Sequence, residues 1–417
     1  MNSLGARIRK LRKEKKLTLE ALAGDRLTKG MLSQIENEKA KPSMESLDYI
    51  AERLGVKASE LLEEVAPSSI RSLLEQVEIL FAEVKWGDIV RYQEIVDLIK
   101  PSVEGLPHSY EAGRLLYIYA VTQYEAGLTS WETSLLQART IFKEINLLSH
   151  WFKTFILQMS ILAGKRQYDL AYACILQAQE IIKQEDYQLD SRDALLMAYY
   201  TSILQLAIGE HEEGKKLINE TITNAHKNQL FYKIDDMYRI GAYCAMIDHD
   251  FEQAEHMFMK LEQYRAFAER ALVDAFIFIL RAHYNNNYMF NYEQALIEIE
   301  SFNKLKHEDL DILDSNYYYA EKGKSLYLLG RYEEARDVFE HFQKAPNFVS
   351  HPYDILGLNE CFSYKALCYA HFGELTTAYD IAKMAYTDSL DLVDLPYKRK
   401  IEEVYMTIRA QIDSNSY

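Results

Sequence analysis

The chain contains 417 residues, of which only 16 are glycine and 7 are proline, less than half of the roughly 12% that globular proteins carry in these two types. Folds with many hairpins and tight turns need both residues, so the composition argues against sandwiches, barrels, propellers and Gly-rich nucleotide folds. The formal net charge is −16, which for the chain as a whole is unlike that of a nucleic-acid-binding protein.

The charge is unevenly divided along the chain. Residues 1–41 hold 11 lysines and arginines against 5 acidic residues and so carry +6, whereas the other 376 residues carry −22. This asymmetry predicts a small basic module attached to a large acidic body.

The sequence pattern also bears on compartment and redox chemistry. The basic N-terminal stretch is followed by no apolar segment, and no run of 18 apolar residues occurs, so we expect neither a signal peptide nor a transmembrane helix. The four cysteines show no ligand spacing, which favours buried thiols of a cytoplasmic protein over a metal or redox site. They are Cys174, Cys244, Cys361 and Cys368.

Five short helices are predicted within residues 1–64. Leu4, Ile8 and Leu11 recur at i, i+4 and i+7 and give the first helix one apolar stripe. The fifth helix is a short turn over residues 58–62, after a glycine that ends the fourth. The second, third and fourth helices each follow a residue favoured as an N-cap, namely Thr18, Thr28 and Ser43.

The string LTLEALA…LTKGMLSQIENEKAKPSMESLDYIAERLGV, within residues 4–64, resembles the Xre or lambda-repressor type of helix-turn-helix DNA-binding domain. The connection between Ala23 and Leu27 is one residue shorter than is usual, and its glycine is displaced to Gly24. The resemblance implies that the third helix lies in the major groove of DNA. It also implies a structural ion pair between Arg12 and Glu36.

The resemblance assigns DNA contacts to particular positions. Lys29 would donate to guanine acceptors and Gln34 would pair with adenine, while two lysines of the following loop would meet phosphates. The alternative for each lysine is an ordinary solvated surface charge. The full set expected to bind DNA is Thr28, Lys29, Gly30, Ser33, Gln34, Lys39 and Lys41.

A domain boundary is predicted after residue 64, where the helical periodicity breaks. Pro67 disfavours a helix at the preceding residue, so we assign residues 65–84 to a linker and a linker helix. Residues 85–417 then form the acidic body.

The body repeats one phrase at a period near 40. The clearest copy, beginning at Arg331-Tyr332, has an alanine at 335 and Phe339, and resembles the tetratricopeptide repeat. Two helices per period predict an all-α fold, in which about eight helix pairs stack into a right-handed α-solenoid with a concave inner face. The copies are anchored at Trp131, Tyr168, His211, Phe251, Tyr292, Tyr332 and Leu375.

The order of the two parts, a helix-turn-helix module before a long degenerate repeat array, resembles the Rap/Rgg/NprR/PlcR/PrgX quorum-sensing regulators of Gram-positive bacteria. In length and domain order the chain is most similar to the NprR branch. The resemblance implies a cytoplasmic homodimer, or a tetramer, that binds a palindromic double-stranded operator. A short signalling peptide on the concave face would change the oligomeric state and the binding of DNA or of a response-regulator partner.

Candidate peptide-binding residues share one register of the repeats. Asn316 and Asn359 lie 14 residues before Gly330 and Gly373, and Asp235 lies 14 before His249. Asparagine satisfies both the N–H and the C=O of an extended peptide, although asparagine and aspartate also favour helix caps. Three aromatic residues follow three positions later, where packing between repeats is the alternative: Tyr238, Tyr319 and Phe362.

No motif for catalysis or cofactor binding is present, since HExxH, GxxxxGK[ST], GxSxG and GxGxxG are all missing. We therefore expect no enzymatic activity, no cofactor and no metal. Two other classes stay open beside a peptide-gated transcription regulator: a protein-interaction scaffold that sequesters a partner such as a response regulator, and a phosphatase acting on that partner.

Overall fold

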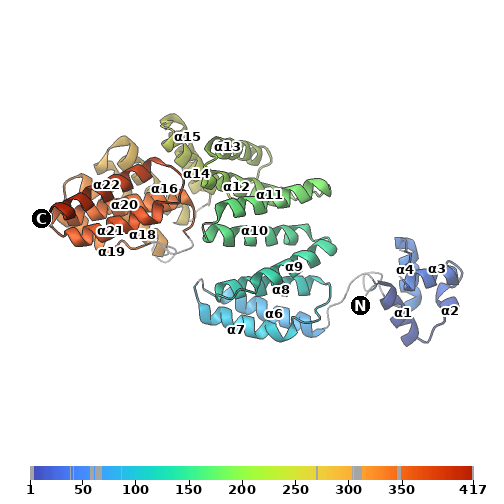
Figure 1. Cartoon of the computed structure of the whole chain (residues 1–417). Coiled ribbons are helices and arrows are strands. Elements are labelled where there is room, and N and C mark those ends of the chain that lie inside the picture. The colour runs from blue at the N-terminus through green and yellow to red at the C-terminus, as the bar shows by residue number, and fades with distance from the viewer. Residues whose placement is uncertain are drawn as a thin grey trace. The chain divides into compact units, whose positions relative to one another are not determined.

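The computed structural model of the chain describes residues 4–37, 39–40, 42–56, 61, 68–85, 87–268, 271–302, 304, 312–344 and 349–415. Within these ranges the secondary structure is helical and no strand occurs, so the predicted all-α class is confirmed (Figure 1). Contacts divide the chain into two units, Met1–Leu157 and Gln158–Tyr417, and each is described by itself.

Unit 1 begins with four short helices around one apolar core, which includes Ile8, Leu22 and Leu32. The three predicted N-caps are confirmed, because each cap hydroxyl accepts a hydrogen bond from the backbone N–H three residues later. Of the predicted fifth helix only Leu61 lies within the described residues. The helices are α1 Leu4–Glu14, α2 Leu19–Ala23, α3 Lys29–Glu36 and α4 Met44–Leu54.

The rest of unit 1 is a second group of packed helices. The predicted linker helix is present as α6, and it packs against α7 and α8 with Leu74 and Val77 buried beside Ile95 and Ile118. This helix therefore contributes to a hydrophobic core rather than standing apart. The elements are α6 Ser68–Glu83, α7 Ile89–Ile99, the 3₁₀ turn η1 Lys100–Ser102, α8 Tyr110–Glu125 and α9 Trp131–Glu144, and α10 Leu148–Gly164 crosses into unit 2.

Unit 2 is built from helices in sequential pairs, here termed A and B, for example α12 with α13 and α18 with α19. All predicted anchors, including Trp131 in unit 1, are the first residues of B helices, so the period near 40 is confirmed as the spacing of helix pairs. The elements are α11 Tyr168–Gln184, α12 Ser191–Ile208, α13 His211–Lys227, α14 Ile234–Ile247, α15 Phe251–Ala268, α16 Ala271–Tyr284, the π-helical turn η2 Asn285–Met289, α17 Tyr292–Phe302, α18 Ile312–Leu328, α19 Tyr332–His341, α20 Pro352–His371, α21 Leu375–Ser389 and α22 Pro396–Asn415.

Small residues set the close approach of A and B helices. Ala335, three residues into α19, has no exposed surface, and the equivalent position holds a buried alanine, glycine or serine in the other pairs. A Cβ added to Gly323 of α18 would lie 2.5 Å from the ring of Phe339. The low glycine count therefore reflects long helices, with a few glycines kept where a large side chain of the B helix needs the space.

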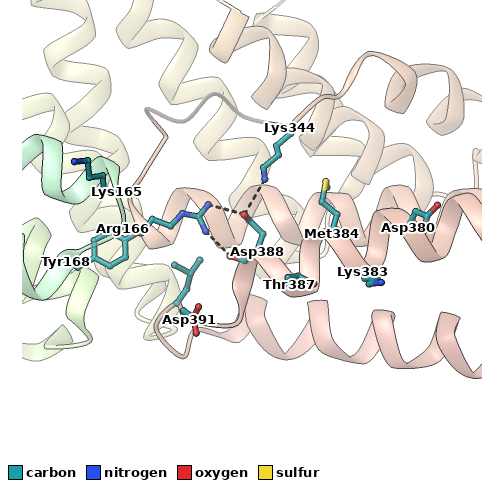
Figure 2. Close-up of a pocket in the computed structure, with 11 residues that line it drawn as sticks. Lys165, Arg166, Tyr168, Lys344, Asp380, Lys383, Met384, Thr387, Asp388 and Asp391 are labelled. Atoms are coloured by element: carbon teal, nitrogen blue, oxygen red, sulfur yellow. Dashed lines mark hydrogen bonds and ion pairs between the residues drawn. The ribbon is translucent and has the colours of Figure 1, made fainter. Parts of the chain in front are cut away.

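Unit 2 closes on itself. The turn between α10 and α11 lies beside the end of α21 (Figure 2), where Arg166 donates to the two carboxylate oxygens of Asp388 at 3.1 and 3.2 Å. Close by, the Tyr168 hydroxyl donates to the carbonyl oxygen of Ser350 at 2.6 Å. These contacts join residues 222 and 182 positions apart in the sequence, so the start of the unit meets α21 and the residues before α20 along a seam.

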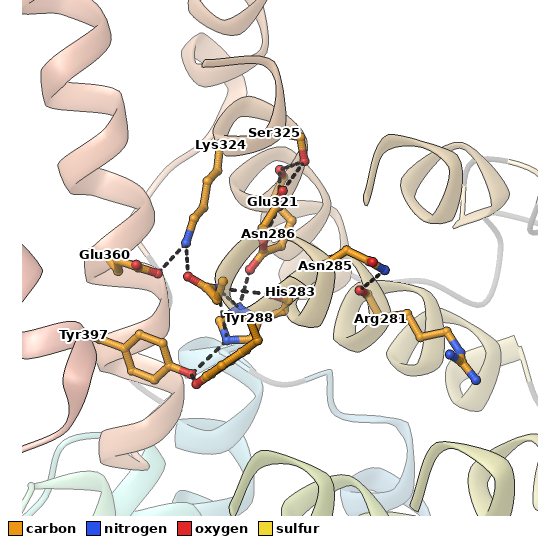
Figure 3. Close-up of polar contacts among 11 residues, drawn as sticks. Arg281, His283, Asn285, Asn286, Tyr288, Glu321, Lys324, Ser325, Glu360 and Tyr397 are labelled. Atoms are coloured by element: carbon orange, nitrogen blue, oxygen red, sulfur yellow. Dashed lines mark hydrogen bonds and ion pairs between the residues drawn. The ribbon is translucent and has the colours of Figure 1, made fainter. Parts of the chain in front are cut away.

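A layer of buried polar groups joins α16, η2, α18 and α20 (Figure 3). Glu321 lies 2.7 Å from the ring of His283 and accepts a hydrogen bond from Asn286 at 2.9 Å. Lys324 has no exposed side-chain surface, and its Nζ lies 2.5 Å from the carboxylate of Glu360. Each buried charge in the layer faces a partner, which is the condition under which charges are tolerated in a protein interior.

Candidate nucleic-acid interface and ligand pocket

The helix α3 and its cap present most of the predicted DNA-reading side chains to solvent. Thr28, Lys29, Gly30 and Gln34 are exposed and Ser33 is partly buried. A Cβ on Gly30 would meet only the Thr28 hydroxyl, at 4.0 Å, so this face of the helix is open to close approach. Whether these side chains read base edges stays a prediction, and their exposure is consistent with it.

Two of these side chains have partners within the module. Lys29 forms an exposed ion pair with Glu20 of α2 at 2.9 Å, and the Thr28 hydroxyl is used as the cap of α3. An exposed ion pair of this kind contributes little to stability, so the ammonium group of Lys29 is available to a base or phosphate at small cost.

The loop after α3 contains the two lysines expected to meet phosphates. Lys39 is exposed, and its backbone N–H donates to the carbonyl of Gln34 at 2.8 Å, so the loop folds back on the end of α3. Lys41 lies outside the described residues. Met31, which was not expected at the interface, is 38% exposed and lies one turn from Gln34 on the helix surface. In the sequence, Met31 falls outside the apolar stripe formed by Leu32 and Ile35, and this pattern could have indicated that its side chain is exposed.

The short turn between α2 and α3 is held by α4. The Tyr49 hydroxyl donates to Asp25 at 2.9 Å, and Arg53 donates to the carbonyl oxygen of Ala21 at 2.6 Å. Gly24 has a φ of +58°, and a Cβ there would lie 2.2 Å from the Tyr49 hydroxyl, so only glycine fits. The hydrogen bond from Tyr49 lowers the pKa of Asp25.

The structural ion pair expected between Arg12 and Glu36 is present. Arg12 donates to the two carboxylate oxygens of Glu36 at 2.6 and 2.8 Å, and the side chains are only 12% and 4% exposed. The pair fixes α1 against the end of α3, and the hydrogen bonds to Glu36 raise the pKa of Arg12.

In unit 2 the side chains of Asn316 and Asn359 form hydrogen bonds within their own helix pairs. The side-chain oxygen of Asn316 accepts from the backbone N–H of Gln343 at 2.9 Å, just after α19. Asn359 donates to Asp388 and Ser389, at the end of α21, at 3.1 and 3.0 Å. Both asparagines lie within helices and are about 5% exposed, so neither is a helix cap, and each ties an A helix to the end of its own B helix.

The three aromatic residues expected beside them also make internal contacts. The Tyr238 hydroxyl lies 2.5 Å from the ring of His226, Tyr319 stacks on His341, and Phe362 stacks on Phe342 at 4.1 Å. Asp235 is partly buried at the start of α14. The asparagines and the aromatic residues are therefore engaged in internal contacts, and the role of the six residues in binding a peptide stays a prediction that the packing does not favour.

A pocket of about 230 Å³ lies among the A helices α14, α16 and α18 and the start of α20. Its walls are mostly aromatic and aliphatic, with one arginine, one histidine and one aspartate among them. The lining residues are Arg239, Tyr243, Phe276, Ile279, Leu280, Tyr317, Val349, Ser350, His351 and Asp354.

Arg239 is the main charged group of this pocket. Its guanidinium lies 3.8 Å from both Asp236 and Asp354, beyond hydrogen-bonding distance, and its buried Nε finds no acceptor among the described residues. Burial opposes the charged form, but the two carboxylates outweigh it and raise the pKa of Arg239. The pocket thus holds a permanent cation whose donors are incompletely used.

His351 lines the same pocket. Its Nε2 bonds to the carbonyl oxygen of Ile203 at 3.0 Å, and its Nδ1 accepts from the backbone N–H of Tyr353, so the ring is neutral. Burial lowers the pKa of His351, although Asp354 acts in the opposite direction.

Neither a metal cluster nor a membrane-spanning element is found in the part of the chain that the structure describes. No group of three or more His, Cys, Asp or Glu there is arranged to hold a metal ion. No helix there has the length and apolar character needed to cross a bilayer.

Known proteins resemble the chain in two ways. Residues 5–67 match a family model described as a helix-turn-helix domain, whereas no curated protein sequence matches the chain. Among solved structures, PlcR of Bacillus thuringiensis, in complex with the peptide PapR7 and DNA, is 18% identical, with 64% of this chain and 98% of PlcR covered and a TM-score of 0.33.

Two further structures are similar at the same low level. The apo competence regulator ComR of Streptococcus vestibularis is 19% identical over 78% of this chain and 98% of its own, with a TM-score of 0.29. The pheromone receptor Rgg2 of Streptococcus dysgalactiae is 11% identical over 93% and 100%, with a TM-score of 0.18. Such scores carry no functional argument, and the closer likeness to NprR stays a prediction. The family match and the geometry agree on one point: the N-terminal part of the chain is similar to helix-turn-helix domains.

Proposed function

We propose that the protein is a cytoplasmic DNA-binding transcription regulator whose repeat array binds a short peptide that changes its oligomeric state and its binding of DNA. The observation that carries the proposal is the N-terminal module, in which α3, capped by Thr28, presents Lys29 and Gln34 to solvent. The match of residues 5–67 to helix-turn-helix domains supports it. In this proposal the protein has no enzymatic activity of its own.

The acidic charge of the repeats agrees with a DNA-binding role for the N-terminal module alone. Residues 42–417 carry −22, which disfavours contact with the DNA backbone. The small basic module would therefore supply the DNA contacts, and a homodimer would present two modules to half-sites roughly 34–36 Å apart.

The pocket beside Arg239 is the place in unit 2 best suited to the ligand. Its volume of about 230 Å³ is below the roughly 300–1,000 Å³ of whole small-molecule sites, so it suits one terminal residue of a peptide rather than the entire ligand. An apolar side chain would meet Ile279 and Leu280, and a carboxylate would use the open donors of Arg239. The register of Asn316 and Asn359 stays the alternative site, which the packing does not favour.

DNA reading is tested by selecting binding sequences from a random double-stranded library and then measuring affinity by fluorescence anisotropy. Each lost base contact is worth about 1–3 kcal/mol, so Lys29→Ala and Gln34→Ala should each weaken specific binding by roughly ten- to a hundredfold. Lys216→Ala, which removes an exposed lysine of unit 2, is the matched control and should leave binding unchanged. Retention of specific affinity by both module variants would show that α3 does not read the bases.

Peptide binding is tested by calorimetric titration of synthetic peptides from small open reading frames beside the gene. A binding peptide should lose at least tenfold in affinity when its C-terminus is amidated or when Arg239 is changed to Gln. Arg331→Gln, at an exposed pair with Glu334, is the control. Flat titrations at tens of micromolar protein would rule out gating by these peptides at about −7 kcal/mol or stronger. If a partner protein instead bound a chain lacking residues 1–64, the scaffold function would be favoured.

A further inference from the structure

The seam of unit 2 is centred on Asp388. This carboxylate receives two hydrogen bonds from Arg166 and lies 3.4 Å from the ammonium group of Lys344 (Figure 2). A second Arg166 nitrogen donates to the backbone carbonyl of Asp388 at 3.0 Å. The backbone of Arg166 has a φ of +58°, and the equivalent turn residues His249 and Gly330 also have a positive φ, so this conformation belongs to the turn between A and B helices.

Three more polar contacts continue the seam toward α20. The Tyr168 hydroxyl donates to Ser350, His351 bonds to the carbonyl of Ile203, and His211 lies 2.7 Å from the hydroxyl of Tyr353. One side of every contact comes from the segment between the α10–α11 turn and the start of α13, and the other side from the residues that begin α20. The first helices of unit 2 are thus joined to its last pair by hydrogen bonds between specific groups.

The seam and the pocket share one segment. Ser350 and His351 bond across the seam, and the same two residues line the pocket with Asp354, which faces Arg239. Movement of residues 350–354 away from α11 and α12 would therefore remove one wall of the pocket and one of the two carboxylates near Arg239. Opening the seam and exposing the cation are one event in this geometry.

The ion pair is the most exposed contact of the seam, since Tyr168 and Tyr353 are buried. The side chains of Arg166 and Asp388 are 38% and 16% exposed, and a partly exposed ion pair contributes little net stability and is screened by salt. The hydrophobic core around it includes Tyr168 and Leu206 on one side of the seam and Tyr353 and Leu392 on the other. The ion pair is therefore the contact of the seam that separates at lowest cost.

We propose that the seam is a reversible clasp over the pocket, and that the pair of Arg166 and Asp388 sets how much of the time the clasp is closed. The role of the clasp in admitting a ligand rests on the proposed function, whereas its opening does not. When it opens, residues 350–354 leave α11 and α12 while the helix pairs stay intact.

Hydrogen–deuterium exchange on the full chain without ligand tests the opening. Arg166→Asp should raise exchange several-fold in residues 349–356 and 163–168, and leave α16 and α18 unchanged. The charge swap Arg166→Asp with Asp388→Arg should recover at least half of the lost protection. Arg331→Asp, which breaks an exposed pair away from the seam, is the matched control and should not affect these segments. The clasp proposal would be overturned if Arg166→Asp and Arg331→Asp gave the same exchange rates in these segments. Faster exchange spread evenly over unit 2 in Arg166→Asp would also overturn it.

Salt provides an independent readout on the unmodified protein. Raising NaCl from 0.05 to 1 M shortens the Debye length from over 10 Å to about 3 Å, so exchange at residues 349–356 should increase in the wild type and change little in Arg166→Asp. Equal salt responses in the two proteins would overturn the role of the pair. Because neither experiment contains a ligand, failure of the peptide titrations would leave the test of clasp opening unaffected.

For a peptide that binds, Arg166→Asp should also change the dissociation rate of the peptide several-fold. An unchanged rate would show that the clasp does not control ligand admission.

Discussion

In the N-terminal module the polar residues singled out by the sequence lie at the surface, whereas in unit 2 they lie in the interior. Lys29 and Gln34 are exposed on α3, while Asn316 and Asn359 are buried and bonded to neighbouring segments. The difference has a physical source. A helix-turn-helix motif has fixed spacings because its surface must fit the groove of DNA. In a solenoid, the residues that recur in each repeat are those that pack one helix pair against the next. A polar residue in a repeat register is therefore first a packing element.

The largest expected effect is the loss of stability of the N-terminal module when its buried ion pair is broken. Arg12→Ala leaves the Glu36 carboxylate, 4% exposed, without its partner, so the module should lose about 3 kcal/mol, the lower end for a broken buried pair. Protection of α1 and α3 against hydrogen exchange measures the loss. Lys10→Ala, at a 73% exposed position, should change protection by less than about 0.5 kcal/mol. Equal protection in the two variants would mean that the pair is not structural.

The second effect concerns the contact between A and B helices in unit 2. Gly323→Ala places a Cβ 2.5 Å from Phe339, so overpacking should destabilise unit 2 by about 1–3 kcal/mol. In Gly357→Ala, on α20, the new Cβ meets nothing within 4 Å, so the higher helix propensity of alanine should stabilise by about 0.5–1 kcal/mol. Urea unfolding of both variants gives the two values. Opposite signs are expected, and the same sign for both would show that packing around Phe339 does not limit the array.

The fold was predictable where local chemistry alone determines it. The caps at Thr18, Thr28 and Ser43 and the starts of the B helices follow from side-chain hydrogen bonding and from a period of small residues, and both are visible in a linear sequence. The pocket and the seam were not predictable, because Arg166 and Asp388 are 222 positions apart. Their meeting depends on the accumulated rotation of the helix pairs, which no local pattern encodes. Arg239 carried no signal because an arginine within a helix is ordinarily a surface residue.

A smaller effect distinguishes the two interpretations of the asparagine register. Asn359→Ala removes hydrogen bonds to Asp388 and Ser389, so we expect a loss of about 1–2 kcal/mol in the stability of unit 2. Affinity for a binding peptide, measured well below the unfolding transition, should stay within about twofold. Loss of affinity with unchanged stability would restore the peptide ladder that the sequence suggested. Asn219→Ala, at an exposed position of α13, is the control for the substitution itself.

The smallest effect is a pH dependence at the seam. Burial lowers the pKa of His351 below its ordinary value of 6.5, against the opposing charge of Asp354 and with Arg239 acting in the same direction as burial. Because the pKa is lowered in the folded state, the folded protein binds fewer protons than the unfolded chain. The contribution of His351 to the free energy of unfolding is therefore present above pH 6.5 and is lost as the pH falls toward the pKa of the folded state. Protonation would also remove the acceptor at Nδ1 that caps α20. The melting temperature of the wild type should therefore fall more between pH 7.5 and 5.5 than that of His351→Gln, whereas His256→Gln, at an exposed histidine, should follow the wild type. Parallel melting curves for all three proteins would show that the neutral imidazole is not what holds residues 350–354 against α12.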